Sequence, residues 1–151
     1  MTNGIRIVSL GLVLGLLTLP LAAGDRKKRK DQPDVVVVQH ILIGFKKSVS
    51  GKQIDRTKKQ AEDLAEELER RARAGETPFE ELVEQYTDDN FPGVYKLTND
   101  DVPLMPRAFA RDDMAVNFSD VAFQLEIGEI GLARYHPGNS PYGWHIIVRL
   151  E

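Results

Sequence analysis

The run Val35–Phe45, VVVVQHILIGF, limits the fold more than any other stretch of the sequence. Its residues are apolar at successive positions, which is typical of a strand covered on both faces of a sheet. His40 interrupts the run, and burying a polar ring is unfavourable unless a partner satisfies it. Gly143–Val148, GWHIIV, repeats the arrangement around His145. The sequence therefore predicts two buried strands that each carry a histidine.

Two helices are predicted after the first strand. Apolar residues at spacings of three and four predict a helix from Ile54 to Ala74, ended by Gly75. A second helix is expected to begin with Thr77 as the N-cap of a capping box closed by Glu80, and to stop near Thr87.

The remaining elements are short. Prolines and polar residues in the segment 88–114 do not predict a regular element. A helix is expected at Phe118–Leu125, and strands are expected at Ile130–Tyr135 and Trp144–Leu150. The order of strand, helices and closing strands predicts one α+β domain over residues 35–151, with helices on a small sheet.

The N-terminal segment, residues 1–24, has the pattern of a signal peptide. The apolar core Ile7–Leu19 follows Arg6 and precedes small residues. As a helix it would span about 20 Å, short of the roughly 30 Å hydrocarbon core. Cleavage and export to the periplasm or medium are expected. Because the polar linker 25–34 begins with the basic run Arg26–Lys30, an uncleaved membrane anchor is the alternative.

Composition excludes several classes of function. Residues 25–151 contain 19 basic and 23 acidic residues, which does not favour nucleic-acid binding. The chain has no cysteine, so thiolate chemistry and disulfides are excluded. It contains no serine-hydrolase elbow, phosphate-binding glycine loop or HExxH motif. A zinc site made of His40, His145 and a carboxylate remains an alternative.

An ordered set of short motifs resembles the parvulin family of peptidyl-prolyl cis-trans isomerases, also called the PpiC or rotamase family. The motifs run in order from Val35 to Glu151: QHILI at 39–43, FEEL at 79–82, YTDD at 86–89, Met114 with Phe118, GEI at 128–130 and GWHII at 143–147. The resemblance implies a four-stranded antiparallel sheet, its first and last strands adjacent at the centre, surrounded by about four helices.

The resemblance also implies roles for individual residues. The positions that match the family's catalytic residues are His40, Asp89, Ser140 and His145, and those that match the proline-binding pocket are Met114, Phe118 and, less directly, Phe109. A family segment before Phe109 is replaced here by GVYK at 93–96, so the residue that completes the pocket is Tyr95, Leu104 or Met105. The family's phosphate-directed basic cluster is missing beside Gly44, so no preference for phosphorylated Ser/Thr-Pro is expected.

The implied activity is isomerisation of X-Pro bonds in unfolded or flexible polypeptides, by a monomer with no cofactor or metal and weak discrimination at the residue before proline. A peptide-binding chaperone module without catalysis is the alternative. Neighbouring strands would bring His40 and His145 opposite each other with Cβ atoms about 5 Å apart, close enough for the rings to bond. Ser140 would fix a tautomer, and activity and stability are expected to fall below about pH 6.

Overall fold

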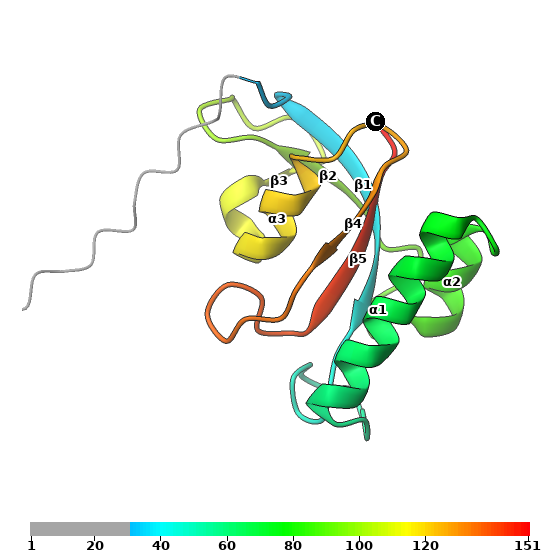
Figure 1. Ribbon diagram of the computed structural model, residues 1–151. Coiled ribbons are helices and arrows are strands. Elements are labelled where there is room, and N and C mark those ends of the chain that lie inside the picture. Colours follow the sequence, from blue (N-terminus) through cyan, green and yellow to red (C-terminus); the bar gives the residue numbers. More distant parts are fainter. Residues whose placement is uncertain (1–30) are drawn as a thin grey trace, which may run out of the picture.

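The computed structural model describes residues 31–151, which form a five-stranded sheet with helices on both faces (Figure 1). The strand order is β3-β2-β1-β5-β4. The bounds are β1 Val35–Ile43, β2 Val94–Thr98, β3 Phe109–Ala110, β4 Ile130–Ala133 and β5 Trp144–Arg149. The signal peptide or anchor and the basic run predicted at the N-terminus lie outside the described residues. Within residues 31–151 no helix is long and apolar enough to span a membrane.

The first and last strands lie side by side at the centre of the sheet, as predicted. β1 pairs antiparallel with β5 on one side and with β2 on the other, and β4 completes the far edge. The prediction of four antiparallel strands missed only the two-residue β3, which pairs parallel to β2 at the other edge. β2 itself lies in the segment where the sequence predicted no element.

Helices cover both faces of the sheet (Figure 1). On one face, α1 (Lys58–Ala74) and α2 (Phe79–Tyr86) form a core with Ile41 and Ile43 of β1. On the other face, α3 (Val116–Ala122) forms a second core with Val36 and Val38. Alternate side chains of β1 therefore enter two different cores, which explains its continuous apolar sequence.

The helix starts differ from the predicted ones. α1 begins four residues later than expected because Thr57 caps it, its hydroxyl accepting from Gln60 N at 3.2 Å while Gln60 Oε1 accepts from Thr57 N. The predicted capping box at Thr77 is wrong. Pro78 is the residue before α2, and no side chain caps this end. A short 3₁₀ turn, η1 (Arg111–Asp113), precedes α3, so three α-helices replace the four expected.

The folded part includes the last residues of the predicted linker. Arg111 is buried, and its Nη1 donates to Gln32 Oε1 at 2.8 Å and to Asn99 Oδ1 at 2.9 Å. Its Nη2 donates to Asp120 Oδ1 at 2.6 Å. The guanidinium thus joins the chain before β1 to the loop after β2 and to α3.

Candidate functional site

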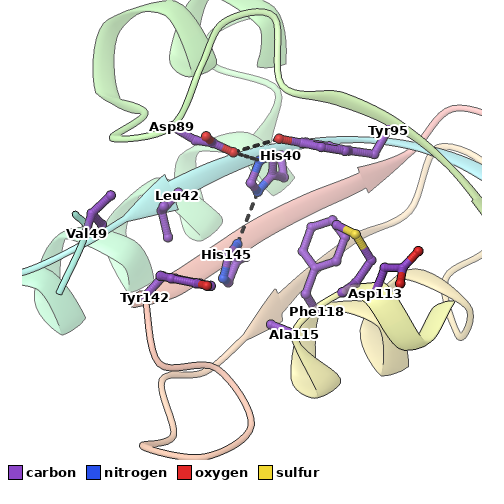
Figure 2. Close-up of a pocket in the computed structure, with 11 residues that line it drawn as sticks. His40, Leu42, Val49, Asp89, Tyr95, Asp113, Ala115, Phe118, Tyr142 and His145 are labelled. Atoms are coloured by element: carbon purple, nitrogen blue, oxygen red, sulfur yellow. Dashed lines mark hydrogen bonds and ion pairs between the residues drawn. The ribbon is translucent and has the colours of Figure 1, made fainter. Parts of the chain in front are cut away.

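A cavity of about 240 Å³ lies between the centre of the sheet and the start of α3 (Figure 2). β1 contributes His40 and Leu42 to its lining, and β5 contributes His145. The other lining residues come from loops and from the region of η1 and α3: Val49, Asp89, Tyr95, Asp113, Met114, Ala115, Phe118 and Tyr142. Apolar and aromatic side chains form most of its wall, while the histidines and Asp89 form a polar end.

The two predicted histidines form a buried pair. Their Nδ1 atoms are 3.1 Å apart, and their rings are stacked with centroids 5.3 Å apart. The register corrects the expected geometry, because His40 lies opposite Ile147 and Leu42 lies opposite His145. The histidines are therefore diagonal neighbours on one face, and the rings reach each other across the diagonal.

Hydrogen bonds link four side chains in a row: Tyr95, Asp89, His40 and His145. Asp89 sets the proton positions in this row. Its Oδ2 lies 3.0 Å from His40 Nε2 and accepts a hydrogen bond from the Tyr95 hydroxyl at 2.8 Å (Figure 2). Since an ionised carboxylate only accepts, His40 Nε2 carries a proton. In a neutral His40 ring, Nδ1 is then the acceptor, and His145 Nδ1–H donates to it. His145 Nε2 remains as a bare buried nitrogen with no hydrogen-bond partner.

The surroundings shift the pKa values in the row. The hydrogen bond from His40 and then that from Tyr95 hold the pKa of Asp89 far below its usual range, although burial acts in the opposite direction. Burial, followed by the neighbouring His40, lowers the pKa of His145 to about 3. Burial and the Asp89 carboxylate raise the pKa of Tyr95 to about 12. Near pH 7 the row thus holds a carboxylate, a neutral His145 and a neutral phenol.

Backbone contacts to β1 hold Asp89 in place. Leu42 N donates to Thr87 Oγ1 at 3.1 Å, and Asp88 N donates to Leu42 O at 2.8 Å. Asp88 Oδ2 accepts from Gly44 N at 2.8 Å and pairs with Arg56. The residues after α2 therefore run alongside the end of β1, which brings Asp89 next to His40.

The apolar wall matches part of the prediction. Met114 and Phe118 line the cavity, with the Phe118 ring edge-on to both histidines at 5.2 Å. Of the three candidates to complete the pocket, Tyr95 lines it, whereas Leu104 and Met105 lie elsewhere and are exposed. Phe109 does not line this cavity, because the Tyr95 ring stands between it and His40, 5.7 Å and 5.2 Å from the two rings.

Ser140 does not make the contact with a histidine that was predicted for it. It is buried, but its Oγ donates to Gly143 O at 3.0 Å, and His145 Nε2 has no partner. The proposed tautomer control by Ser140 is therefore wrong, and Asp89 has that role. Ser140 instead closes the turn that leads into β5. Gly143 in this turn has φ 147°, and a Cβ there would lie 2.1 Å from Ile43 O.

Sequence reasoning missed five lining residues: Leu42, Val49, Asp113, Ala115 and Tyr142. Leu42 could have been predicted, because it is two residues from His40 and therefore lies on the same face of the strand. Val49 and Tyr142 come from loops, whereas Asp113 ends η1 and Ala115 precedes α3. Tertiary contacts bring these four residues to the cavity. Ser48 Oγ, for example, donates to Tyr142 O at 2.7 Å and joins two loops that are 94 residues apart.

The geometry opposes the zinc alternative. The two Nδ1 atoms face each other at hydrogen-bond distance, which leaves no space for an ion between them. Within residues 31–151 no three His, Asp or Glu side chains are arranged to hold a metal.

A small sheet with an antiparallel central pair, a histidine row and an apolar cavity defines a prolyl isomerase domain of the parvulin type. The family model described as Rotamase, PPIC-type PPIASE domain, matches residues 40–151. The chain belongs to this family, and the predicted family and fold class are confirmed.

Solved structures show the same fold. The peptidyl-prolyl isomerase ESS1 from Candida albicans is 23% identical with a TM-score of 0.59, and the match covers 78% of this chain and 63% of that one. The solution structure of TbPIN1 is 25% identical with a TM-score of 0.58, and the match covers 78% of this chain and 98% of that one. This chain therefore spans less than two thirds of the Candida structure but nearly all of TbPIN1.

Proposed function

We propose that this protein catalyses cis-trans isomerisation of X-Pro bonds in unfolded or flexible polypeptides. The observation that carries the proposal is the cavity itself, in which an apolar wall of Met114, Phe118 and Tyr95 faces a fixed carboxylate, Asp89. This combination of a ring-sized apolar surface and one fixed charge fits a reaction that rotates an amide and breaks no bond.

Rotation about the X-Pro bond has a barrier of about 18 to 20 kcal/mol because it destroys amide resonance. The planar amide has negative charge on its oxygen and positive charge on its nitrogen, and the twisted amide has less of both. A surface with few polar groups therefore favours the twisted form over the planar one. Met114 and Phe118 supply an adaptable and a flat contact for the proline ring.

In the proposed mechanism, Asp89 lies on the carbonyl side of the bound amide. Its negative charge opposes the negative charge on the planar amide's oxygen, and this repulsion falls as the amide twists. An interaction that is more favourable in the twisted form than in the planar form lowers the barrier, whereas one that is equal in both does not. Because the pKa of Asp89 is far below its usual range, the carboxylate acts as a charge and not as a general base near pH 7.

The histidines act as a scaffold in this proposal. Burial lowers the pKa of His145 to about 3, which removes it as an acid or base at neutral pH. His40 spans the gap between His145 and Asp89, with one ring nitrogen near each. The pair thereby fixes the carboxylate relative to Phe118 and the floor of the cavity.

A protease-coupled assay of a proline tetrapeptide tests the activity. We expect a rate above the uncatalysed rate that grows linearly with enzyme concentration. The alternative, a peptide-binding module without catalysis, predicts binding of the same peptide with no acceleration. Measuring the dissociation constant and the rate on one peptide therefore separates the two functions.

We also propose that the protein is exported by its N-terminal segment. The apolar core Ile7–Leu19 with flanking Arg6 supports this location, and flexible chains emerging after export would be its substrates. N-terminal sequencing of the protein from its native host tests the proposal. A new N-terminus near Ala23 or Gly24 is expected, and an intact Met1 in a membrane fraction would support the anchor instead.

A further inference from the structure

Three large apolar side chains are exposed together beside the site. Phe91, Val94 and Phe109 are 50%, 46% and 49% exposed, although aromatic and branched residues are more often buried. They come from the loop before β2, from β2 and from β3. Together with Asn90, Pro92, Gly93 and Tyr95 they line a second cavity of about 250 Å³.

This second cavity lies next to the first, and the two share one lining side chain. Tyr95 lines both, with its ring 5.2 Å from His40 on one side and 5.7 Å from Phe109 on the other. Asp89 lines the first cavity, and the next residue, Asn90, lines the second. The second cavity is therefore within reach of the residues that flank a proline bound in the first.

The wall of the second cavity is held by the strand that carries His40. Gly93 O accepts from His40 N at 3.0 Å, and Pro92 O accepts from Gln39 Nε2 at 2.9 Å. Gly93 has φ 65°, and a Cβ there would lie 2.8 Å from His40 O, so glycine permits this close approach. Because the wall is already ordered, binding to it loses little conformational entropy.

We propose that this second cavity is a substrate subsite that binds one large apolar side chain, Phe or Leu, lying within three residues of the proline in the same polypeptide. The inference rests on the proposed function and names its substrate class: proline segments with a nearby large apolar residue. Large apolar side chains are mostly buried in folded proteins and exposed in unfolded ones, so the subsite would direct the enzyme to unfolded chains.

The test uses the full chain and a panel of alanine-rich proline peptides. One Phe is moved from three residues before the proline to three residues after it. We expect one position to raise kcat/KM about tenfold over the all-alanine peptide, and to lower the dissociation constant by a similar factor. The peptide ratio is the kcat/KM of the best Phe peptide divided by that of the all-alanine peptide. In the F91S/F109S double variant this peptide ratio should fall to near one.

Ile127→Ser is the matched control, because Ile127 is 67% exposed and lines neither cavity. This variant should keep the full ratio. Equal rates and equal binding across the panel would overturn the subsite while leaving the isomerase function intact. Conversely, tighter binding of one Phe peptide than of the all-alanine peptide, without any catalysis, would overturn the function and support the subsite.

A second copy of the chain is the other occupant that this surface could bind. Sedimentation of wild type and the F91S/F109S variant tests it. A concentration-dependent dimer that the double variant abolishes, together with an unchanged peptide ratio, would overturn the substrate proposal. A monomer in both cases, with the ratio lost in the variant, would support it.

Discussion

His40 Nε2 lies 3.0 Å from Asp89 Oδ2, and this contact joins the most buried part of the sheet to the open cavity. The His40 side chain is 4% exposed and that of Asp89 is 27% exposed. A charge that would otherwise move with a loop is thereby fixed to β1. Because each proton in the row depends on Asp89 being an acceptor, removing its charge is the most direct test of the site.

Asp89→Asn should lower kcat ten- to a hundredfold, or about 1.4 to 2.8 kcal/mol in the barrier, with little change in peptide affinity. The substitution keeps the shape of the side chain and an acceptor oxygen for Tyr95 but removes the charge. Steady-state kinetics and peptide titration separate the two effects. An equal loss of affinity with unchanged kcat would show that Asp89 only binds substrate.

Asp101→Asn is the matched control for the loss of one negative charge. Asp101 is exposed, does not line the cavity and has φ 61°, a conformation that asparagine also adopts. Its kinetics should equal those of wild type. A similar fall in kcat for both variants would indicate a general effect of net charge.

Acid should destabilise the protein through His145. Burial lowers the pKa of His145 to about 3, whereas an unfolded histidine has a pKa near 6.5. Below pH 6.5 the unfolded chain therefore binds a proton that the folded chain does not. The stability contributed by the neutral ring is complete above pH 6.5 and is lost progressively as the pH falls toward 3. At pH 5 the loss is about 2 kcal/mol.

Urea unfolding between pH 7.5 and pH 5 measures this loss, with His136→Asn as the control. His136 lies on the surface, and asparagine can replace its Nδ1 as acceptor for Gly138 N and Asn139 N. This variant should lose stability with pH as the wild type does. Unchanged unfolding free energy in the wild type from pH 7.5 to pH 5 would contradict the assignment.

Much of the sheet could be predicted because two short segments dominate it. The apolar runs around His40 and His145 can be buried only on central strands, where the Nδ1 atoms of the two rings form a hydrogen bond. Their diagonal register could not be predicted, since the pattern of each strand fixes its two faces but not which residues lie opposite. The contact between the rings was expected from two histidines that lie directly opposite each other, whereas the register makes them diagonal neighbours.

The parts of the site that could not be predicted depend on long-range contacts. Tyr95 enters the cavity because Gly93 approaches the backbone of His40, and β2 has no strong strand pattern of its own. Phe109 lies beyond Tyr95 because β3 pairs with β2 at the edge of the sheet, away from β1. A local sequence pattern indicates burial and element type, but it does not specify which loop closes over a pocket.

Gly143→Ala should lower the unfolding free energy by at least about 2 kcal/mol, because φ 147° is strained for alanine and its Cβ would lie 2.1 Å from Ile43 O. Gly51→Ala is the control for backbone strain alone. Gly51 has φ 73° and no atom within 4 Å of the added Cβ, so the unfolding free energy should fall by roughly 1 kcal/mol. Urea unfolding of both variants compares them, and equal losses would show that the contact with Ile43 is relieved easily.

Negative charge in the cavity should oppose a negatively charged substrate. The cavity is lined by two carboxylates, Asp89 and Asp113, and by no lysine or arginine. A phosphate adds about −1.5 to −2 charge at pH 7. We therefore expect phosphoserine before proline to lower kcat/KM roughly threefold to tenfold relative to serine, or about 0.7 to 1.4 kcal/mol.

Two further measurements identify the cause of this discrimination. Asp113→Asn should reduce the ratio between the serine and phosphoserine peptides, because it removes one of the two lining charges. Raising the salt from 0.1 to about 1 M should reduce the ratio as well, since screening shortens the range of the repulsion. Lysines at 46, 47 and 52 lie in the loop that contributes Val49, but none of them lines the cavity. A faster reaction with the phosphorylated peptide would show that these lysines dominate over the carboxylates, and the predicted order of substrates would be reversed.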